Sequence, residues 1–249
     1  MKYFQLISLL FLLNSEVLLS GDNAYPLENG VHRMGVFQPN IFGMKNNLEV
    51  STHPILFLIK PNVQVKKYHG ELKDIGLASR YSFDYSTQLL KLIQREGEFG
   101  ILSKDPDIGA IPNLFIIQGE WLVTKKLTGF SLTGKLGMSI CPGCELDKRH
   151  IVDLPLTYPR MAIYHYGIAA NSGVDLIYNF SENITIKTDL DLLFIPEEDI
   201  FIEHKLLCNY QLVKKFTLSA GYKLIHGNYP YGKQRDIFPL IDLSWEWEK

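Results

Sequence analysis

Apolar and polar residues alternate along the last third of the chain, in segments about a dozen residues long. Between Ile184 and Phe194 nearly every even position is apolar, whereas the odd positions include Lys187, Asp189 and Asp191. A period of two places these sets of side chains on opposite faces of a β-strand. Both sets are satisfied if the apolar face contacts lipid and the charged face lines a closed lumen. The pattern therefore predicts strands of a barrel that crosses a membrane.

Ten segments repeat this pattern. They span 48–52, 63–65, 75–83, 115–123, 130–140, 166–180, 184–194, 202–212, 216–224 and 237–247. Their connections alternate between short and long, as periplasmic turns and external loops do in transmembrane barrels. We therefore expect an all-β fold, an antiparallel up-and-down transmembrane β-barrel of about ten strands over 47–249, with both chain ends in the periplasm.

Alternation alone does not say which face is inside, because a soluble barrel or sandwich would bury the apolar parity instead. The length of the segments favours the membrane, since a tilted transmembrane strand needs about 9–11 residues and soluble strands usually have about 5–6. Aromatic residues also lie near predicted strand ends, as interfacial girdles do. They are Tyr166, Tyr178, Phe180, Tyr229, Trp245 and Trp247. A secreted soluble β-barrel that binds an apolar ligand stays open as an alternative.

The N-terminal region differs from the rest. Lys2, the apolar run Tyr3–Leu13 and the small residues Ser15 and Ser20 predict a signal peptide over 1–20 that is removed on export. Eleven apolar residues are too few for a membrane-spanning helix, which needs about twenty. Residues 21–46 contain two prolines and predict an irregular periplasmic lead-in that plugs the lumen or lies beneath it. Residues 87–95 predict a short amphipathic helix packed over the barrel mouth.

Composition narrows the function classes. The 249 residues carry a net charge of -2 and show no basic patch, so no nucleic-acid partner is expected. Of three cysteines, Cys141 and Cys144 have a spacing that suits a small disulfide loop, which leaves Cys208 alone. The same spacing can serve metal or redox chemistry, but no second ligand pair follows it. We therefore expect no metal and no cofactor.

The closing segment Leu240–Trp247, the signal peptide and the alternating strands together resemble Gram-negative outer-membrane proteins as a broad class. The chain departs from that class in one respect, because Glu248 and Lys249 follow Trp247, whereas such proteins usually end on an aromatic residue. The resemblance implies an outer-membrane location, contact with outer-membrane lipid and lipopolysaccharide, and insertion by the barrel-assembly machinery.

The polar parity of the strands places charged side chains in the lumen. The predicted lumen-lining residues are Arg80, Glu120, Lys135, Asp175, Lys187, Asp189, Asp191, Glu203, Lys205, Lys223 and Asp242, with Glu49, Lys66, Asp84 and Glu246 on the same parity. Opposite charges that face one another across a narrow lumen should pair. Such pairs either fill and stiffen the barrel or line a polar pore. The sequence thus predicts a structural, surface-binding or small-solute passage role.

An enzyme at the external mouth is the alternative. His53, Asp84 and His165 lie near predicted external strand ends, where a carboxylate orienting an imidazole could activate water in a hydrolase. His204 and His226 are predicted to face outward near the outer leaflet, as in barrel enzymes that modify lipid, but the serine-containing run of those enzymes is missing. The sequence also lacks a glycine-rich phosphate loop and a serine elbow.

Overall fold

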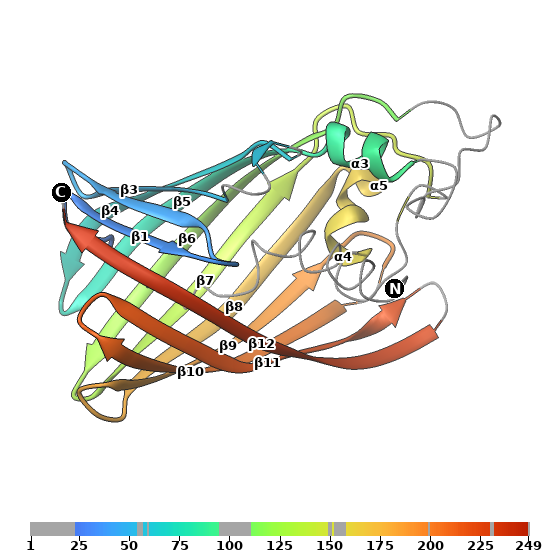
Figure 1. Ribbon diagram of the computed structural model, residues 1–249. Helices are drawn as coiled ribbons and strands as arrows, with labels where there is room; N and C mark the ends of the chain where they lie inside the picture. Colours follow the sequence, from blue (N-terminus) through green and yellow to red (C-terminus); the bar gives the residue numbers. More distant parts are fainter. Residues whose placement is uncertain are drawn as a thin grey trace.

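The computed structural model describes residues 23–53, 57–58, 60–94, 111–148, 151, 158–198, 200–229 and 232–248 (Figure 1). Within these residues, twelve antiparallel strands form one closed barrel, in which each strand pairs with its chain neighbours and β1 pairs with β12. The strands are β1 (Val31–Gly35), β2 (Asn40–Met44), β3 (Leu48–Thr52), β4 (Asn62–Leu72), β5 (Ile75–Tyr85), β6 (Phe115–Leu127), β7 (Phe130–Ile140), β8 (Ile168–Asn179), β9 (Ile184–Phe194), β10 (Ile200–Val213), β11 (Phe216–Tyr229) and β12 (Gly232–Glu248). The prediction of an all-β, antiparallel, up-and-down barrel is confirmed.

The predicted number of about ten strands is wrong, because the described chain contains twelve. The two additional strands, β1 and β2, lie inside the segment 21–46 that the sequence predicts to be irregular. Each has only five residues, which is too few to show a convincing alternation. β1 pairs with β12, and β2 pairs with β3. These two segments are therefore strands because of their hydrogen-bonding partners, and not because of an alternating pattern in their own sequence.

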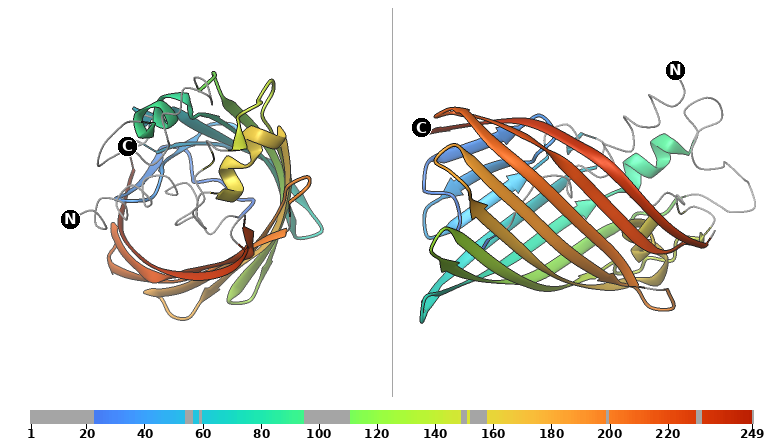
Figure 2. Two further views of the ribbon diagram at one scale, coloured as in Figure 1. Left: turned by 90° about the vertical axis from the view of Figure 1, so that its right-hand side faces the viewer. Right: turned by 90° about the horizontal axis from the view of Figure 1, so that it is seen from below.

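Tight turns join the strands at the end of the barrel that holds the C-terminus, here called the turn end (Figure 2). Lys73 and Asp74 connect β4 to β5, and both have positive φ angles, of 51° and 64°. A two-residue hairpin of this kind matches the twist of the flanking strands. The opposite end, here called the loop end, carries the long connections, and these supply the covering of the mouth.

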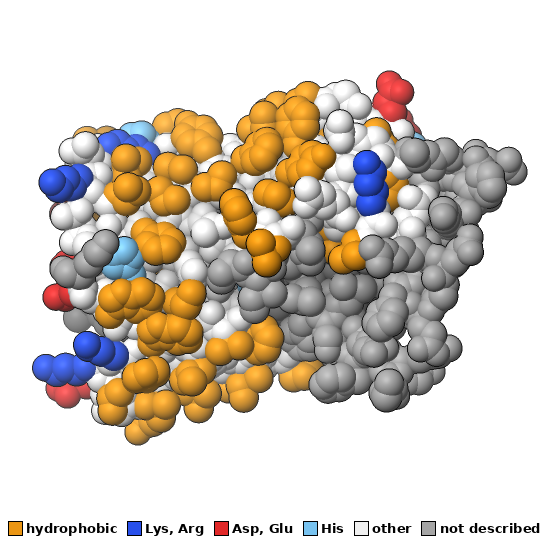
Figure 3. All heavy atoms as spheres, turned by 45° about the horizontal axis from the view of Figure 1, so that its top comes forward, with side chains coloured by type: hydrophobic (Ala, Val, Ile, Leu, Met, Phe, Trp, Pro, Cys, Tyr) orange, Lys and Arg blue, Asp and Glu red, His pale blue; other side chains and the backbone are white. Residues whose placement is uncertain are grey.

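The outer wall is apolar. Side chains such as Leu136, Ile237 and Ile241 point outward and are 65%, 62% and 65% exposed. Figure 3 shows this band of apolar side chains along the wall, with charged side chains at its ends. Because apolar residues of this number and size do not remain in contact with water in a folded soluble protein, the wall is built for lipid. Within the described part of the chain, no helix is both long and apolar enough to span a bilayer.

The loop end is covered by a second, apolar core. Helices α3 (Thr87–Ile93), α4 (Tyr158–Met161) and α5 (Ile163–Tyr166) pack there against inward-facing Phe201, Ile225 and Tyr229 of the barrel. The aromatic girdle predicted from the sequence is therefore corrected at two positions. Tyr229 is buried in this core, and Tyr166 ends α5 rather than beginning a strand.

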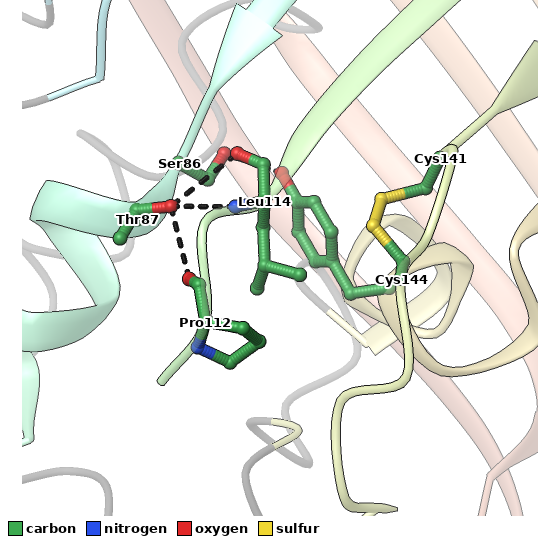
Figure 4. The surroundings of a disulfide bond; sticks show 7 residues. Ser86, Thr87, Pro112, Leu114, Cys141 and Cys144 are labelled. Atoms are coloured by element: carbon green, nitrogen blue, oxygen red, sulfur yellow. Dashed lines mark hydrogen bonds between the residues drawn. A yellow bond between two sulfur atoms is a disulfide. The ribbon is translucent and has the colours of Figure 1, made fainter. Parts of the chain in front are cut away.

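Two links hold this covering together (Figure 4). Cys141 and Cys144, directly after β7, form a disulfide with a Cα separation of 5.4 Å. Thr87 at the start of α3 accepts a hydrogen bond from the Leu114 backbone amide at 2.7 Å, and its hydroxyl lies 3.2 Å from the Pro112 carbonyl oxygen. The hydrogen bonds join the segment before β6 to the start of α3, and the disulfide closes a four-residue loop directly after β7. Cys208 is a free and exposed cysteine on β10.

Candidate functional site

The charged residues predicted for the lumen lie on the inner face of the wall. Eight of the eleven are buried, namely Glu120, Lys135, Asp175, Asp189, Glu203, Lys205, Lys223 and Asp242. Arg80 and Asp191 line a cavity toward the loop end, and Lys187 lines a second cavity toward the turn end. Since apolar side chains on the same strands are exposed, the barrel has the inverse polarity of a soluble β-barrel.

Strands β7 to β10 carry the central ion pairs of the lumen. The Lys135 ammonium lies 2.7 Å from a carboxylate oxygen of Asp175 and 2.7 Å from one of Asp191. Next to it, Lys205 pairs with Asp189 at 2.6 Å. The register of β8, β9 and β10 places these residues opposite one another, because Asp175 and Lys205 both flank Asp189. Burial makes such charges costly unless they are paired, so these contacts hold the wall in one arrangement.

Glu203 is the centre of a second group, which sequence reasoning found only in part. Arg160 of α4 donates two hydrogen bonds of 2.6 Å to the two carboxylate oxygens of Glu203, and the Lys223 ammonium lies 2.8 Å away. Arg160 follows Pro159 in a long loop without periodicity, and therefore nothing in the local sequence indicates that it reaches the lumen. Through this bidentate contact, the covering of the loop end is fastened to the barrel wall.

A third group lies next to the first, on β5, β6 and β8. Arg80 of β5 donates to the Glu120 carboxylate of β6, and the Asn171 amide of β8 donates to the same carboxylate at 2.7 Å. Lys66 of β4 pairs with Glu49 of β3 at 2.9 Å. The inner faces of β3 to β11 therefore carry charges of both signs that are joined in pairs, whereas Asp242 on β12 accepts hydrogen bonds from the Phe37 backbone amide and the Gln38 side-chain amide.

These pairs separate two cavities. The loop-side cavity has a volume of about 270 Å³ and is lined by residues that include Asp189, Lys205 and Glu203. The turn-side cavity has about 260 Å³ and is lined by residues that include Lys187 and Asn209. Lys187 and Asp189 are successive inward residues of β9, which lie roughly 7 Å apart along a strand. The septum between the cavities is thus only about one layer of side chains thick.

Residues 23–28 occupy part of the lumen at the turn end. The Ala24 amide donates to the Thr124 hydroxyl at 2.7 Å, and the Leu27 amide donates to Glu49 at 2.8 Å. The Tyr25 hydroxyl donates to Glu71 at 2.9 Å, while the Lys126 ammonium lies 3.4 Å from the centre of the tyrosine ring. Burial and then the bond to Glu71 raise the pKa of Tyr25 to about 12. We call these residues the turn-end plug.

The histidine candidates are held by local contacts. The His53 Nε2 atom lies 3.3 Å from the Phe37 carbonyl, and the His165 Nδ1 atom lies 2.7 Å from the Leu146 carbonyl. Asp84 lies 3.4 Å from Lys60. Of the three predicted residues, only Asp84 is among the described residues that line the loop-side cavity. His165 belongs to α5, not to a strand end as the sequence suggests.

His204 and His226 are held by neutral partners. His204 Nε2 lies 3.0 Å from the Thr188 hydroxyl, and His226 Nδ1 lies 3.1 Å from the Gln234 carbonyl. Neither contact joins an imidazole to a carboxylate that would orient it as a base. Within the described ranges, no group of three or more His, Cys, Asp or Glu side chains could hold a metal ion.

The closed antiparallel barrel, with its apolar outer wall and charged interior, is of the broad outer-membrane β-barrel class. Among solved structures, the chain is similar to the crystal structure of Acinetobacter baumannii OccAB2, with 10% sequence identity and a TM-score of 0.41. The similarity covers 93% of this chain and 59% of that chain, so the chain spans less than two thirds of the length of its structural relative. No family model matches the sequence, and the search of curated proteins found no match.

Proposed function

We propose that this protein resides in the outer membrane and serves as a narrow passage for small polar solutes. The observation that carries this proposal is the pair of cavities, of about 270 and 260 Å³, on the two sides of a septum about one side-chain layer thick. A lumen that served only to stiffen the barrel would have its interior filled by side chains, as small barrels do.

The size and charge of the loop-side cavity define the solutes. Its volume lies just below the roughly 300 to 1,000 Å³ of pockets for drug-sized ligands, so it fits small molecules. Five cationic and five acidic side chains line it, which are Lys60, Arg80, Lys135, Arg160 and Lys205, and Asp84, Glu120, Asp189, Asp191 and Glu203. Because the charges balance, the cavity favours neutral or zwitterionic solutes over ions of either sign.

Conductance across planar lipid bilayers tests the proposal. The double variant Asp189→Ala with Lys205→Ala removes both members of one ion pair of the septum. Neither residue is therefore left as a buried charge without its partner. We expect the wild-type protein to show small single-channel currents and the double variant larger ones, because the septum becomes wider.

The matched control is Leu190→Ala, on the lipid-facing side of β9, where the side chain is 45% exposed. This variant should conduct as the wild type does, since it alters the same strand without touching the lumen. If neither the wild-type protein nor the double variant conducts, the proposed passage does not exist.

A further inference from the structure

The turn-side cavity carries a net positive charge, unlike the loop-side cavity. Four cationic and two acidic residues line it, which are Arg33, Lys187, Lys214, Lys215, Glu182 and Glu246. These charges leave a net charge of +2, whereas the loop-side cavity is lined by five charges of each sign. An excess of one sign in a cavity attracts solutes of the opposite sign. The turn-side cavity therefore favours anions.

The lysines carry this excess charge. Arg33 on β1 donates from Nε at 2.9 Å and from a terminal nitrogen at 2.6 Å to one carboxylate oxygen of Glu246 on β12, so these two residues neutralise each other. The three lysines of the lining are then balanced only by Glu182. Lys187 lies on the inner face of β9, and its direct cross-strand neighbours on β8 and β10 are apolar.

Lys214 and Lys215 form the tight turn between β10 and β11, at the turn end of the barrel. Two hydrogen bonds hold this turn in place. The Glu246 backbone amide donates to the Lys215 carbonyl at 2.9 Å, and the Gln211 side chain donates to the Lys214 carbonyl at 3.3 Å. The turn thus presents two adjacent, exposed ammonium groups at the rim of the cavity.

Neutral polar side chains line the wall next to the lysines. Strands β9, β10 and β11 lie side by side (Figure 1), and their register places Asn209 opposite both Thr185 and Ser219, and Gln211 opposite Thr217. These five side chains share the inward parity and line the cavity, and we call them the hydroxyl-amide patch. Hydroxyl and amide groups both donate and accept hydrogen bonds, so the patch suits a solute with several hydroxyl groups.

We propose that the turn-side cavity is a binding site for a sugar phosphate, which enters from the turn end. A phosphate monoester carries a charge of about -1.5 to -2 near pH 7, which matches the net charge of the lining, whereas a single carboxylate would neutralise only half of it. The phosphate is placed among the lysines, and the sugar hydroxyls contact the hydroxyl-amide patch.

A bound sugar phosphate would also obstruct the passage. The charge-balanced loop-side cavity offers no positive excess beyond the septum, so the anion stays on the turn side and fills the route there. The binding site goes beyond the proposed function, and only this effect on current rests on it.

Isothermal titration calorimetry of the folded protein in a neutral detergent tests the site. The probes are glucose 6-phosphate, glucose and inorganic phosphate. We expect glucose 6-phosphate to bind at least about tenfold more tightly than either of the others, because glucose lacks the charge and inorganic phosphate lacks the sugar hydroxyls. Affinity should also fall as the pH drops below about 6, where the phosphate takes up its second proton.

Two double variants separate the charge from the hydroxyl contacts, and heat-modifiable gel migration shows that each is folded. Lys214→Gln with Lys215→Gln should weaken binding of glucose 6-phosphate at least about tenfold. Lys73→Gln with Lys125→Gln is the matched control, because it removes the same charge from exposed lysines outside the cavity lining, and it should change affinity by about twofold or less. Thr217→Val with Ser219→Ala removes two hydroxyls at nearly constant size. It should weaken glucose 6-phosphate about fivefold and leave inorganic phosphate unaffected.

The outcomes for the site and for the passage are distinct. Equal affinities of the lysine variant and its control would refute the site, and equal affinities for inorganic phosphate and glucose 6-phosphate would refute the sugar contacts. In planar bilayers, glucose 6-phosphate added on the side of the turn end should reduce the current. A protein that conducts but does not bind the probe would refute the site and retain the passage, whereas one that binds without conducting would retain the site alone.

Discussion

Replacing Glu203 by glutamine should destabilise the barrel far more than the loss of an ordinary surface charge. The Glu203 side chain keeps its shape in this variant, but the carboxylate that neutralises Arg160 and Lys223 is lost. Arg160 is 31% exposed in its side chain and can recover solvation from water. The Lys223 side chain is 1% exposed and cannot recover solvation, so its charge stays buried without a carboxylate to neutralise it.

The magnitude follows from this difference in burial. Removing one partner of a buried ion pair costs about 3 to 5 kcal/mol, which is at least about a hundredfold in the unfolding equilibrium. Adding Lys223→Met to Glu203→Gln removes the buried ammonium charge that lacks a partner. The double variant should therefore recover more than half of the lost free energy of unfolding. The matched control is Glu246→Gln, because Glu246 pairs with Arg33 at 2.6 Å with both side chains exposed, at 43% and 36%. That change should cost about 1 kcal/mol or less.

Urea unfolding from lipid vesicles measures these free energies, with the fluorescence of the three tryptophans as the signal. Two of them, Trp245 and Trp247, lie on β12 beside the strand closure, and Trp121 lies outward on β6. A loss of less than about 1 kcal/mol in Glu203→Gln, equal to that of the control, would refute the reasoning. It would mean that water reaches Lys223 and that the septum is open.

Two further predictions concern transport. The pKa of Tyr25 is raised from 10.0 to about 12, so its contribution to holding the turn-end plug is complete below pH 10 and is lost as the pH rises toward 12. Single-channel current should rise over this pH window in the wild-type protein but not in Tyr25→Phe, and identical profiles would contradict the role of the hydroxyl. Lys135→Met removes the cation shared by Asp175 and Asp191, and should shift the reversal potential in a KCl gradient toward cation selectivity. Lys233→Met, on the exposed end of β12, serves as the control and should leave that potential unchanged.

The long strands could be predicted from the sequence because their alternation is regular over 11 residues or more. Lys187, Asp189 and Asp191 occur on one parity of one strand, which places them on one face, and the length of the segments favours the membrane barrel in which that face is the inner one. The five-residue strands β1 and β2 could not be predicted, since their conformation depends on pairing with β12 and β3. Segments as short as these, each with one glycine, carry too little local information to predict a strand.

Only part of the candidate site could be predicted from the sequence, for a similar reason. Parity indicates Glu203 and Lys223, but Arg160 comes from a loop whose position depends on the apolar core around α4 and α5. His165 shows the reverse error. Its parity with the residues of β8 suggests a strand, whereas the chain forms α5 and ends it at Gly167, which has a φ of 77°. Glycine tolerates this left-handed conformation and thus stops the helix just before β8.

The turn-end plug divides the interior lengthwise. Its contacts are with Glu49, Glu71 and Thr124, on the β3, β4 and β6 side, whereas the turn-side cavity lies along β1 and β9 to β12. A molecule leaving the septum toward the turn end would therefore follow a single flank of the cylinder. Large side chains introduced on that flank should reduce the passage of solutes. Side chains of the same size on the other flank should have little effect, because the turn-end plug already occupies that side of the lumen.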